Sequence, residues 1–143
     1  GSTNSYTNMS MEYSVRNFVY VNSGSIEVTL TPFLYEKYLY SKKNDEIMNK
    51  ISDINIYNIN EKHKNNYNKI KFLQIKLNTN QLLFIPNYWY YSIKILEDET
   101  LVSLYKYKTY SNCMSLLPQY LLQYLQKHNI KNNYVKKAIS KIN

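Results

Sequence analysis

The most informative stretch of the chain is residues 82–93, which read LLFIPNYWYYSI. Residues 82–86 are apolar and end in Pro86, a pattern that predicts a short strand terminated by proline. Residues 90–95 return to aromatic and β-branched types and predict a second strand. Even this segment falls well short of the ~20 apolar residues of a membrane helix, so we expect no membrane partner.

Strands and turns alternate on both sides of this stretch. Turns are predicted at 23–25, where Gly24 is free to adopt a positive φ, at the Asn-rich 78–80, and at the acidic 97–99. Period-two alternation or aromatic and β-branched content predicts further strands at residues 17–22, 26–30, 69–77 and 100–107. Short strands at regular spacing indicate a mainly β fold, a sandwich or a barrel.

Helical patterns are confined to the middle and the end of the chain. A short helix is expected at 43–51, followed by an Asn/Lys-rich surface loop at 58–68. Apolar residues recur with helical spacing from 116 to 125, and a second, shorter helix is expected at 132–142. We divide the chain into a tag remnant and flexible N-terminus at 1–9, a β-barrel at 10–110 and a C-terminal helical segment at 111–143.

The composition excludes several classes of protein. With 143 residues, 44% of them hydrophobic, the chain suits one domain with a packed core. Its single cysteine, Cys113, excludes a disulfide framework, and the two separated histidines, His63 and His128, argue against a histidine-rich metal site.

Because no basic and apolar leader opens the chain, we expect an intracellular protein that is not secreted. The bias toward Asn, Lys, Ile and Tyr is typical of AT-rich genomes, so we expect a giant virus or a protist as the source, with a viral protein in the host cytoplasm or the virion.

Three blocks of the sequence resemble the cupin-like JmjC hydroxylases, which include the asparaginyl hydroxylase type. In that family an apolar strand runs into Ile-Pro, two residues, two aromatics and a metal-binding His, and residues 82–93 follow this order with Tyr91 at the last position. Residues 72–81 are similar to the strand and turn that precede that block, and residues 17–32 resemble the family's hairpin. The resemblance covers roughly residues 10–110 and implies a double-stranded β-helix, a barrel of two facing antiparallel sheets, followed here by α-helices.

The resemblance also implies that the family's metal ligands are missing. The family holds ferrous iron with a His, an acidic residue two positions later and a distant His. Carried over by position, these ligands fall on Met11, Tyr13 and Tyr91, and Fe(II) prefers none of these side chains. Glu12 would take the acidic position only through a one-residue register slip, which turns a side chain to the opposite face of its strand.

The positions that bind 2-oxoglutarate in the family are altered as well. The lysine that pairs with the co-substrate falls on Ile26, and a polar contact on the last barrel strand falls on Ser103. We therefore predict a degenerate, non-catalytic domain with no metal and no cofactor. The enzymatic alternative is an Fe(II)/2-oxoglutarate oxygenase whose ligands the sequence does not reveal.

Two apolar surfaces are candidates for interaction. The barrel mouth becomes lined with aromatic residues, and Tyr88 and Trp89 mark a candidate pocket there; the rings either fill the former cavity or bind a flat or apolar ligand. The C-terminal helix either pairs two subunits, as the helices after the barrel do in the asparaginyl hydroxylase type, or packs on its own barrel. Its apolar stripe consists of Leu117, Leu121, Tyr124 and Leu125.

The end of the chain is strongly basic, since seven lysines and no acids follow Glu99 within a net charge of +8. The candidate phosphate contacts are Lys106, Lys108, Lys136 and Lys137. Lysine without arginine favours weak, sequence-blind contact, and a solvated helix face is the simpler alternative. We predict a protein-interaction or structural module that works as a homodimer or with a protein partner, and a nucleic-acid-associated accessory protein is the alternative.

Overall fold

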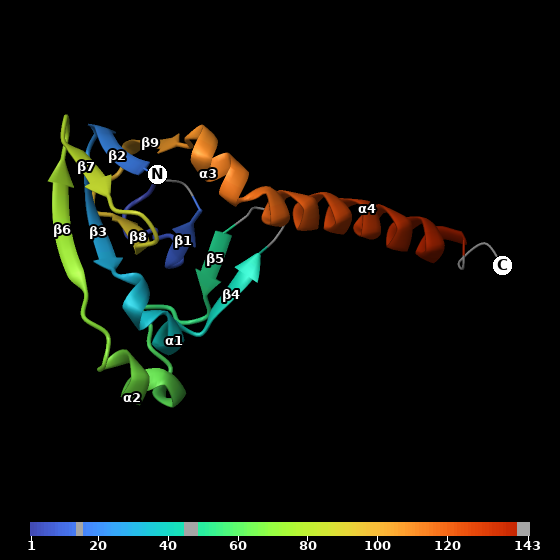
Figure 1. The fold of residues 1–143 in the computed structure, drawn as a ribbon. Coiled ribbons are helices and arrows are strands. Elements are labelled where there is room, and N and C mark those ends of the chain that lie inside the picture. The colour runs from blue at the N-terminus through green and yellow to red at the C-terminus, as the bar shows by residue number, and fades with distance from the viewer. Residues whose placement is uncertain (14–15, 45–48, 140–143) are drawn as a thin grey trace.

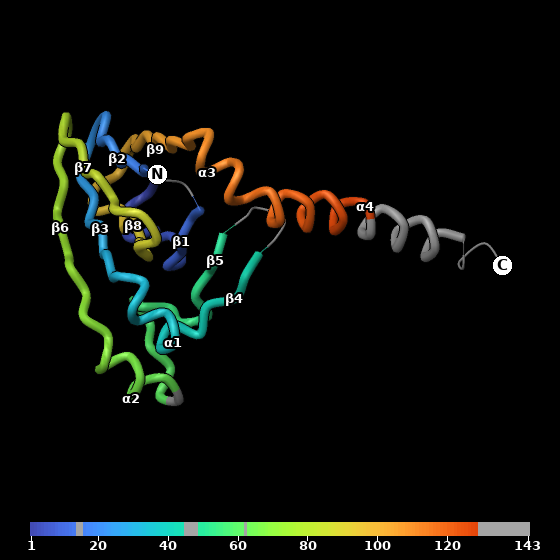
Figure 2. Tube along the Cα trace, in the orientation of Figure 1, coloured from blue at the N-terminus to red at the C-terminus, as the bar shows by residue number. Residues whose placement is uncertain are grey.

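The computed structural model describes residues 1–13, 16–44 and 49–139, and within them all side chains except those of residues 62 and 129–139 (Figure 2). The described strands form two antiparallel sheets (Figure 1). The larger sheet has the strand order β4(Ser41–Asn44), β5(Asn49–Ser52), β1(Ser10–Glu12), β8(Tyr90–Ile95), β3(Ser25–Thr31) and β6(Leu73–Asn78). The smaller sheet has the order β7(Leu82–Ile85), β2(Arg16–Ser23) and β9(Leu101–Tyr107).

The two sheets face each other across one hydrophobic core. Alternate residues of each strand point inward, because successive side chains of a strand lie on opposite faces. Val28 of β3, Ile93 of β8 and Val19 of β2 are all buried in this core. The predicted fold class, mainly β with two facing antiparallel sheets and helices at the C-terminus, is confirmed.

A second core lies on the outer face of the larger sheet. Its buried members are Met9, Met11, Leu39, Ile70 and Tyr90. Leu39 belongs to the short helix α1(Glu36–Leu39), which follows the 3-10 helix η1(Phe33–Tyr35), while Ile70 comes from the segment that leads into β6. Because both faces of the larger sheet are covered, its central strands are buried on both sides; Tyr90 through Ile93 form an unbroken buried run in β8.

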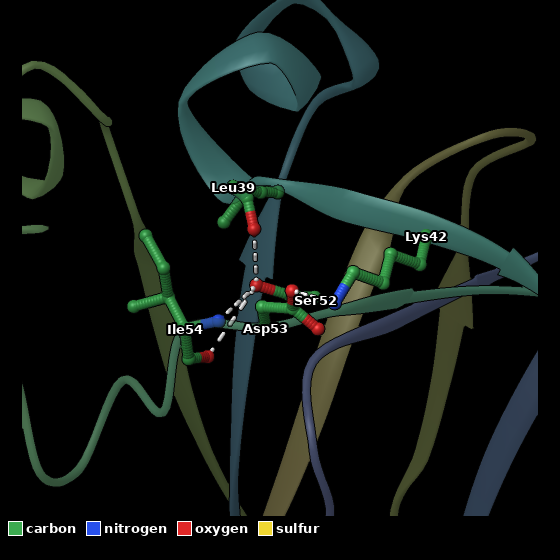
Figure 3. Close-up of polar contacts among 5 residues, drawn as sticks. All are labelled: Leu39, Lys42, Ser52, Asp53 and Ile54. Atoms are coloured by element: carbon green, nitrogen blue, oxygen red, sulfur yellow. Dashed lines mark hydrogen bonds and ion pairs between the residues drawn. The ribbon is translucent and has the colours of Figure 1, made fainter.

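The helix expected at 43–51 is not formed, since β4 and β5 make an antiparallel hairpin there, with 45–48 outside the described residues. Figure 3 shows how the base of this hairpin is held. The Ser52 hydroxyl donates a 2.7 Å hydrogen bond to the Leu39 carbonyl and accepts one from the Ile54 backbone N–H at 3.0 Å. These tertiary contacts override a local sequence that is polar enough to favour either structure.

The Asn/Lys-rich stretch at 58–68 is partly helical rather than a plain loop. It contains the 3-10 helix η2(Glu61–His63) and the short helix α2(Lys64–Tyr67). The predicted turns are present: Gly24 has φ +79° between β2 and β3, and Asn80 has φ +65° between β6 and β7. A Cβ at Gly24 would also collide with Thr100. Both the positive φ and this collision therefore favour glycine here.

The C-terminal segment is helical, as expected, but its division differs. A short helix, α3(Tyr110–Ser115), precedes one long helix, α4(Leu117–Ile139), which joins the two helices expected at 116–125 and 132–142. Residues 140–142 lie outside the described part of the chain. Figure 1 shows α4 extending away from the sheets. None of the helices in the described ranges is both long and apolar enough to span a bilayer.

Candidate functional site

A polar cluster joins the two sheets at one end of the barrel. Glu12 ends β1, Tyr91 is near the start of β8, and Lys106 is near the end of β9. One carboxylate oxygen of Glu12, Oε1, accepts a 3.0 Å hydrogen bond from the Tyr91 hydroxyl and lies 2.7 Å from Lys106 Nζ. The ion pair therefore crosses from the larger sheet to the smaller one.

The register of β1 determines which residues reach this cluster. Ser10 lies opposite Tyr91 in the β1–β8 pair, so Ser10 and Glu12 share the face of Tyr91, between the sheets. Met11 points to the other face and is buried in the outer core, with Tyr13 packed against the same core. The structure thus does not bring Met11 and Tyr13 together with Tyr91, and the residue it brings there instead is Glu12.

Burial sets the protonation of Tyr91. The side chain is 5% exposed, and desolvation, followed by the negative charge of Glu12, raises the pKa of the Tyr91 phenol well above its ordinary value. The phenol is therefore neutral and acts as a hydrogen-bond donor. Asn17 of β2 lies opposite Lys106 on the same inward face, and its Oδ1 is buried with no hydrogen-bond partner among the described residues.

The donor groups of this cluster do not suit ferrous iron. Fe(II) sites of this kind take two imidazoles and a carboxylate, with open positions for substrate. Here the one carboxylate, Glu12, is paired with Lys106, and Tyr91 keeps its proton. His63 makes an edge-to-face contact with the ring of Tyr40, at a centroid distance of 4.8 Å. Among the described residues no three His, Cys, Asp or Glu side chains gather closely enough to hold a metal ion.

The two predicted co-substrate positions are separated. Ile26 is fully buried in the core between the sheets. Ser103 donates a 2.8 Å hydrogen bond to Asn22 Oδ1 on the exposed side of the smaller sheet. Because Val102 packs inward, its neighbour Ser103 points outward by strand alternation, and Ile26 and Ser103 do not share a site.

Tyr88 and Trp89 line a hollow at the surface of the molecule. They border a surface cavity of about 480 Å³ together with Pro32, Phe33 and Leu34. Tyr88 is 46% exposed and has φ +60°, whereas Trp89 packs partly against the core between the sheets. Met11, Tyr13 and Tyr91 are not among the residues that line this hollow.

The first three turns of α4 carry an uncovered apolar stripe. Leu121 and Tyr124 are each about 60% exposed. At 100° per residue the exposed Leu117, Leu121, Tyr124 and Leu125 lie on one side of the helix, as the sequence predicts. Leu116, just before α4, is buried, so the helix is anchored at its start and uncovered beyond it. Over residues 117–128, whose side chains are described, α4 runs away from the sheets and not across them (Figure 1).

Two of the four candidate phosphate contacts have partners within the chain. Lys106 pairs with Glu12, and Lys108 Nζ donates a 3.1 Å hydrogen bond to the Tyr120 hydroxyl. Both cations are therefore engaged within the chain. Lys136 and Lys137 are part of α4, but their side chains lie outside the described ones.

Sequence reasoning missed the pairing of Glu12 with Lys106. The signal for it was the charge of Glu12, which lies at the start of the predicted barrel, where a partly buried acid requires a counterion. What sequence alone does not supply is the strand register that places Lys106 beside it.

Comparison with known families gives one finding. Residues 1–113 match the family described as the cupin-like domain. No curated protein matches the chain.

Proposed function

The chain belongs to the cupin-like family, since the match covers more than half of it, and from this premise we propose a non-catalytic member that acts as a structural or interaction module in a homodimer. The observation that carries the proposal is the exposed apolar stripe of α4. Four large apolar side chains on one side of a helix seldom remain in water, and such patches mark protein interfaces.

The surface area of the chain agrees with an uncovered interface. The accessible surface is 9673 Å², whereas a compact monomer of this mass exposes about 7,800 Å². The difference of about 1,900 Å² belongs to the whole extended chain, in which α4 leaves the sheets, and a standard interface needs ~800 Å² from each partner. A second copy of α4 packed along Leu121 and Leu125 would cover the exposed stripe through a two-fold axis.

The absence of catalysis is supported by the chemistry of the polar cluster. Its carboxylate is already neutralised by Lys106, and its phenol is a neutral donor. Neither group is available as an anionic ligand. The bias toward Asn and Lys supports the further proposal that the gene comes from an AT-rich viral genome.

The dimer is tested by Leu121→Glu, with Gln126→Glu as the matched control on the opposite side of the same helix. Both changes add one carboxylate to an exposed position of α4. Light scattering after size exclusion should give a dimer mass for the wild type and for Gln126→Glu, and a monomer mass for Leu121→Glu. A monomeric wild type, or a dimer that survives Leu121→Glu, would refute the proposed interface.

Catalysis is tested separately by iron and 2-oxoglutarate. Purified protein incubated with Fe(II), ascorbate and 2-oxoglutarate should produce no succinate above the protein-free control. Turnover that depends on both iron and protein would overturn the non-catalytic proposal while leaving the dimer proposal standing.

A further inference from the structure

The Glu12–Lys106 pair has an unusual position for an ion pair in a small barrel. The side chain of Glu12 is 17% exposed and that of Lys106 is 43% exposed, so the carboxylate is the more buried partner. The same Glu12 oxygen also accepts the Tyr91 hydrogen bond. A partly buried carboxylate of this kind favours a positive charge beside it, because desolvation of an unpaired anion is costly.

We propose that Lys106 is a tethered cation that occupies the position at Glu12 where the barrel would otherwise accept a metal ion. The ammonium group supplies the positive charge from within the chain. It therefore removes the need for a bound cation beside Glu12.

The donor groups around the ammonium support this interpretation. The ammonium lies 2.7 Å from a carboxylate oxygen of Glu12, and Asn17, opposite Lys106 in the strand pair, has a buried amide oxygen without a hydrogen-bond partner among the described residues. Carboxylate and amide oxygens are ligands that hard divalent cations such as Mn²⁺ accept. Removal of the lysine side chain should leave an oxygen-lined site with a net negative charge.

The inference rests on the proposed non-catalytic role, because an active iron site would need this position free. The two proposals depend on different residues. The tethered cation depends only on Glu12 and Lys106, whereas the dimer depends on α4. The two proposals therefore fail in different measurements.

The test uses Mn²⁺ as the probe and the loss of its free-ion EPR signal as the readout. Wild-type protein should leave the signal unchanged, while Lys106→Ala should bind Mn²⁺ and remove half of the signal or more at equal concentrations. Lys108→Ala is the matched control, since it deletes the next lysine but leaves Glu12 paired, and it should behave as wild type. The double variant Glu12→Gln/Lys106→Ala should lose the gained Mn²⁺ binding.

Stability provides a second readout for the same variants. Loss of one partner of a partly buried pair should lower the melting temperature by about 3–8 °C in Lys106→Ala, and Mn²⁺ should restore part of this loss. If Lys106→Ala does not fold, Lys106→Gln removes the charge and keeps a hydrogen-bond donor for Glu12. Mn²⁺ binding by the wild type, or no gain of binding in the folded lysine variant, would overturn the proposal. All these variants should remain dimers.

Discussion

Ser10 lies directly opposite Tyr91 in the antiparallel pair of β1 and β8. Opposite residues of such a pair have Cβ atoms about 5 Å apart on one face, and the residue two positions along shares that face. Ser10, Glu12 and Tyr91 are therefore the residues of this region that can act together. Met11 is excluded, because it faces the outer core.

This register predicts how a metal site could be built. Ser10→His and Tyr91→His, combined with Lys106→Met, would place two imidazoles and the Glu12 carboxylate on one face, the arrangement that Fe(II) and Co²⁺ accept. We expect visible absorption of bound Co²⁺ and a higher melting temperature with the metal.

The control for that design is Met11→His in place of Ser10→His. It carries the same number of imidazoles, with one on the opposite face of β1, and it should show no Co²⁺ absorption. Equal binding by both designs would show that the register of β1 in solution differs from the one described here.

Stability should decrease in alkaline solution because of Tyr90 and Tyr91. Burial is the main cause that raises the pKa of both phenols above 10.0, so the folded chain keeps protons that the unfolded chain loses. Their contribution is complete below pH 10.0 and is lost above it, by about 1.4 kcal/mol per pH unit for each tyrosine. Urea unfolding across this range should show the decrease, and Tyr91→Phe should reduce its slope, whereas Tyr110→Phe, at an exposed ring, should not.

Ser52 and Lys42 are expected to differ in their effect on stability, although both hold the β4–β5 hairpin (Figure 3). Ser52→Ala leaves the buried Leu39 carbonyl and the Ile54 N–H without their partner and should cost about 1–3 kcal/mol. Lys42→Ala removes an exposed ion pair with Asp53 and should cost under about 1 kcal/mol. Urea unfolding measures both, and a larger loss for Lys42→Ala would contradict this assignment.

Much of the barrel could be predicted from the sequence because its strands obey local rules. Alternation in 26–30 and the β-branched content of 17–22 correspond to β3 and β2, and the run 100–107 corresponds to β9. β2 is buried on alternate residues, so its core-facing side repeats with the period of a strand, whereas β3 is buried on both faces and was identified by the alternation of its residue types. The helical spacing from 116 to 125 predicted the start of α4 for the same reason.

The residues that meet in the polar cluster could not be predicted from the sequence. Positions counted from distant motifs place Met11 inward, but a difference of one residue reverses the face, and only pairing with Tyr91 fixes it. The outer core was missed because its members come from segments without periodicity, such as Leu39 and Ile70. Likewise, the hairpin at 41–52 depends on Ser52 and its contacts outside that segment.

The two-sided burial of β8 has a consequence for hydrogen exchange. Tyr90 through Ile93 are buried in a strand that lies between β1 and β3 with a core on each face, and the Ile93 N–H donates to Thr7 Oγ1, so these amides should exchange with deuterium only when the whole domain opens. The amides of β8 should therefore have the slowest hydrogen exchange in the molecule. Those of the outer β4–β5 hairpin should exchange faster, through smaller, local openings.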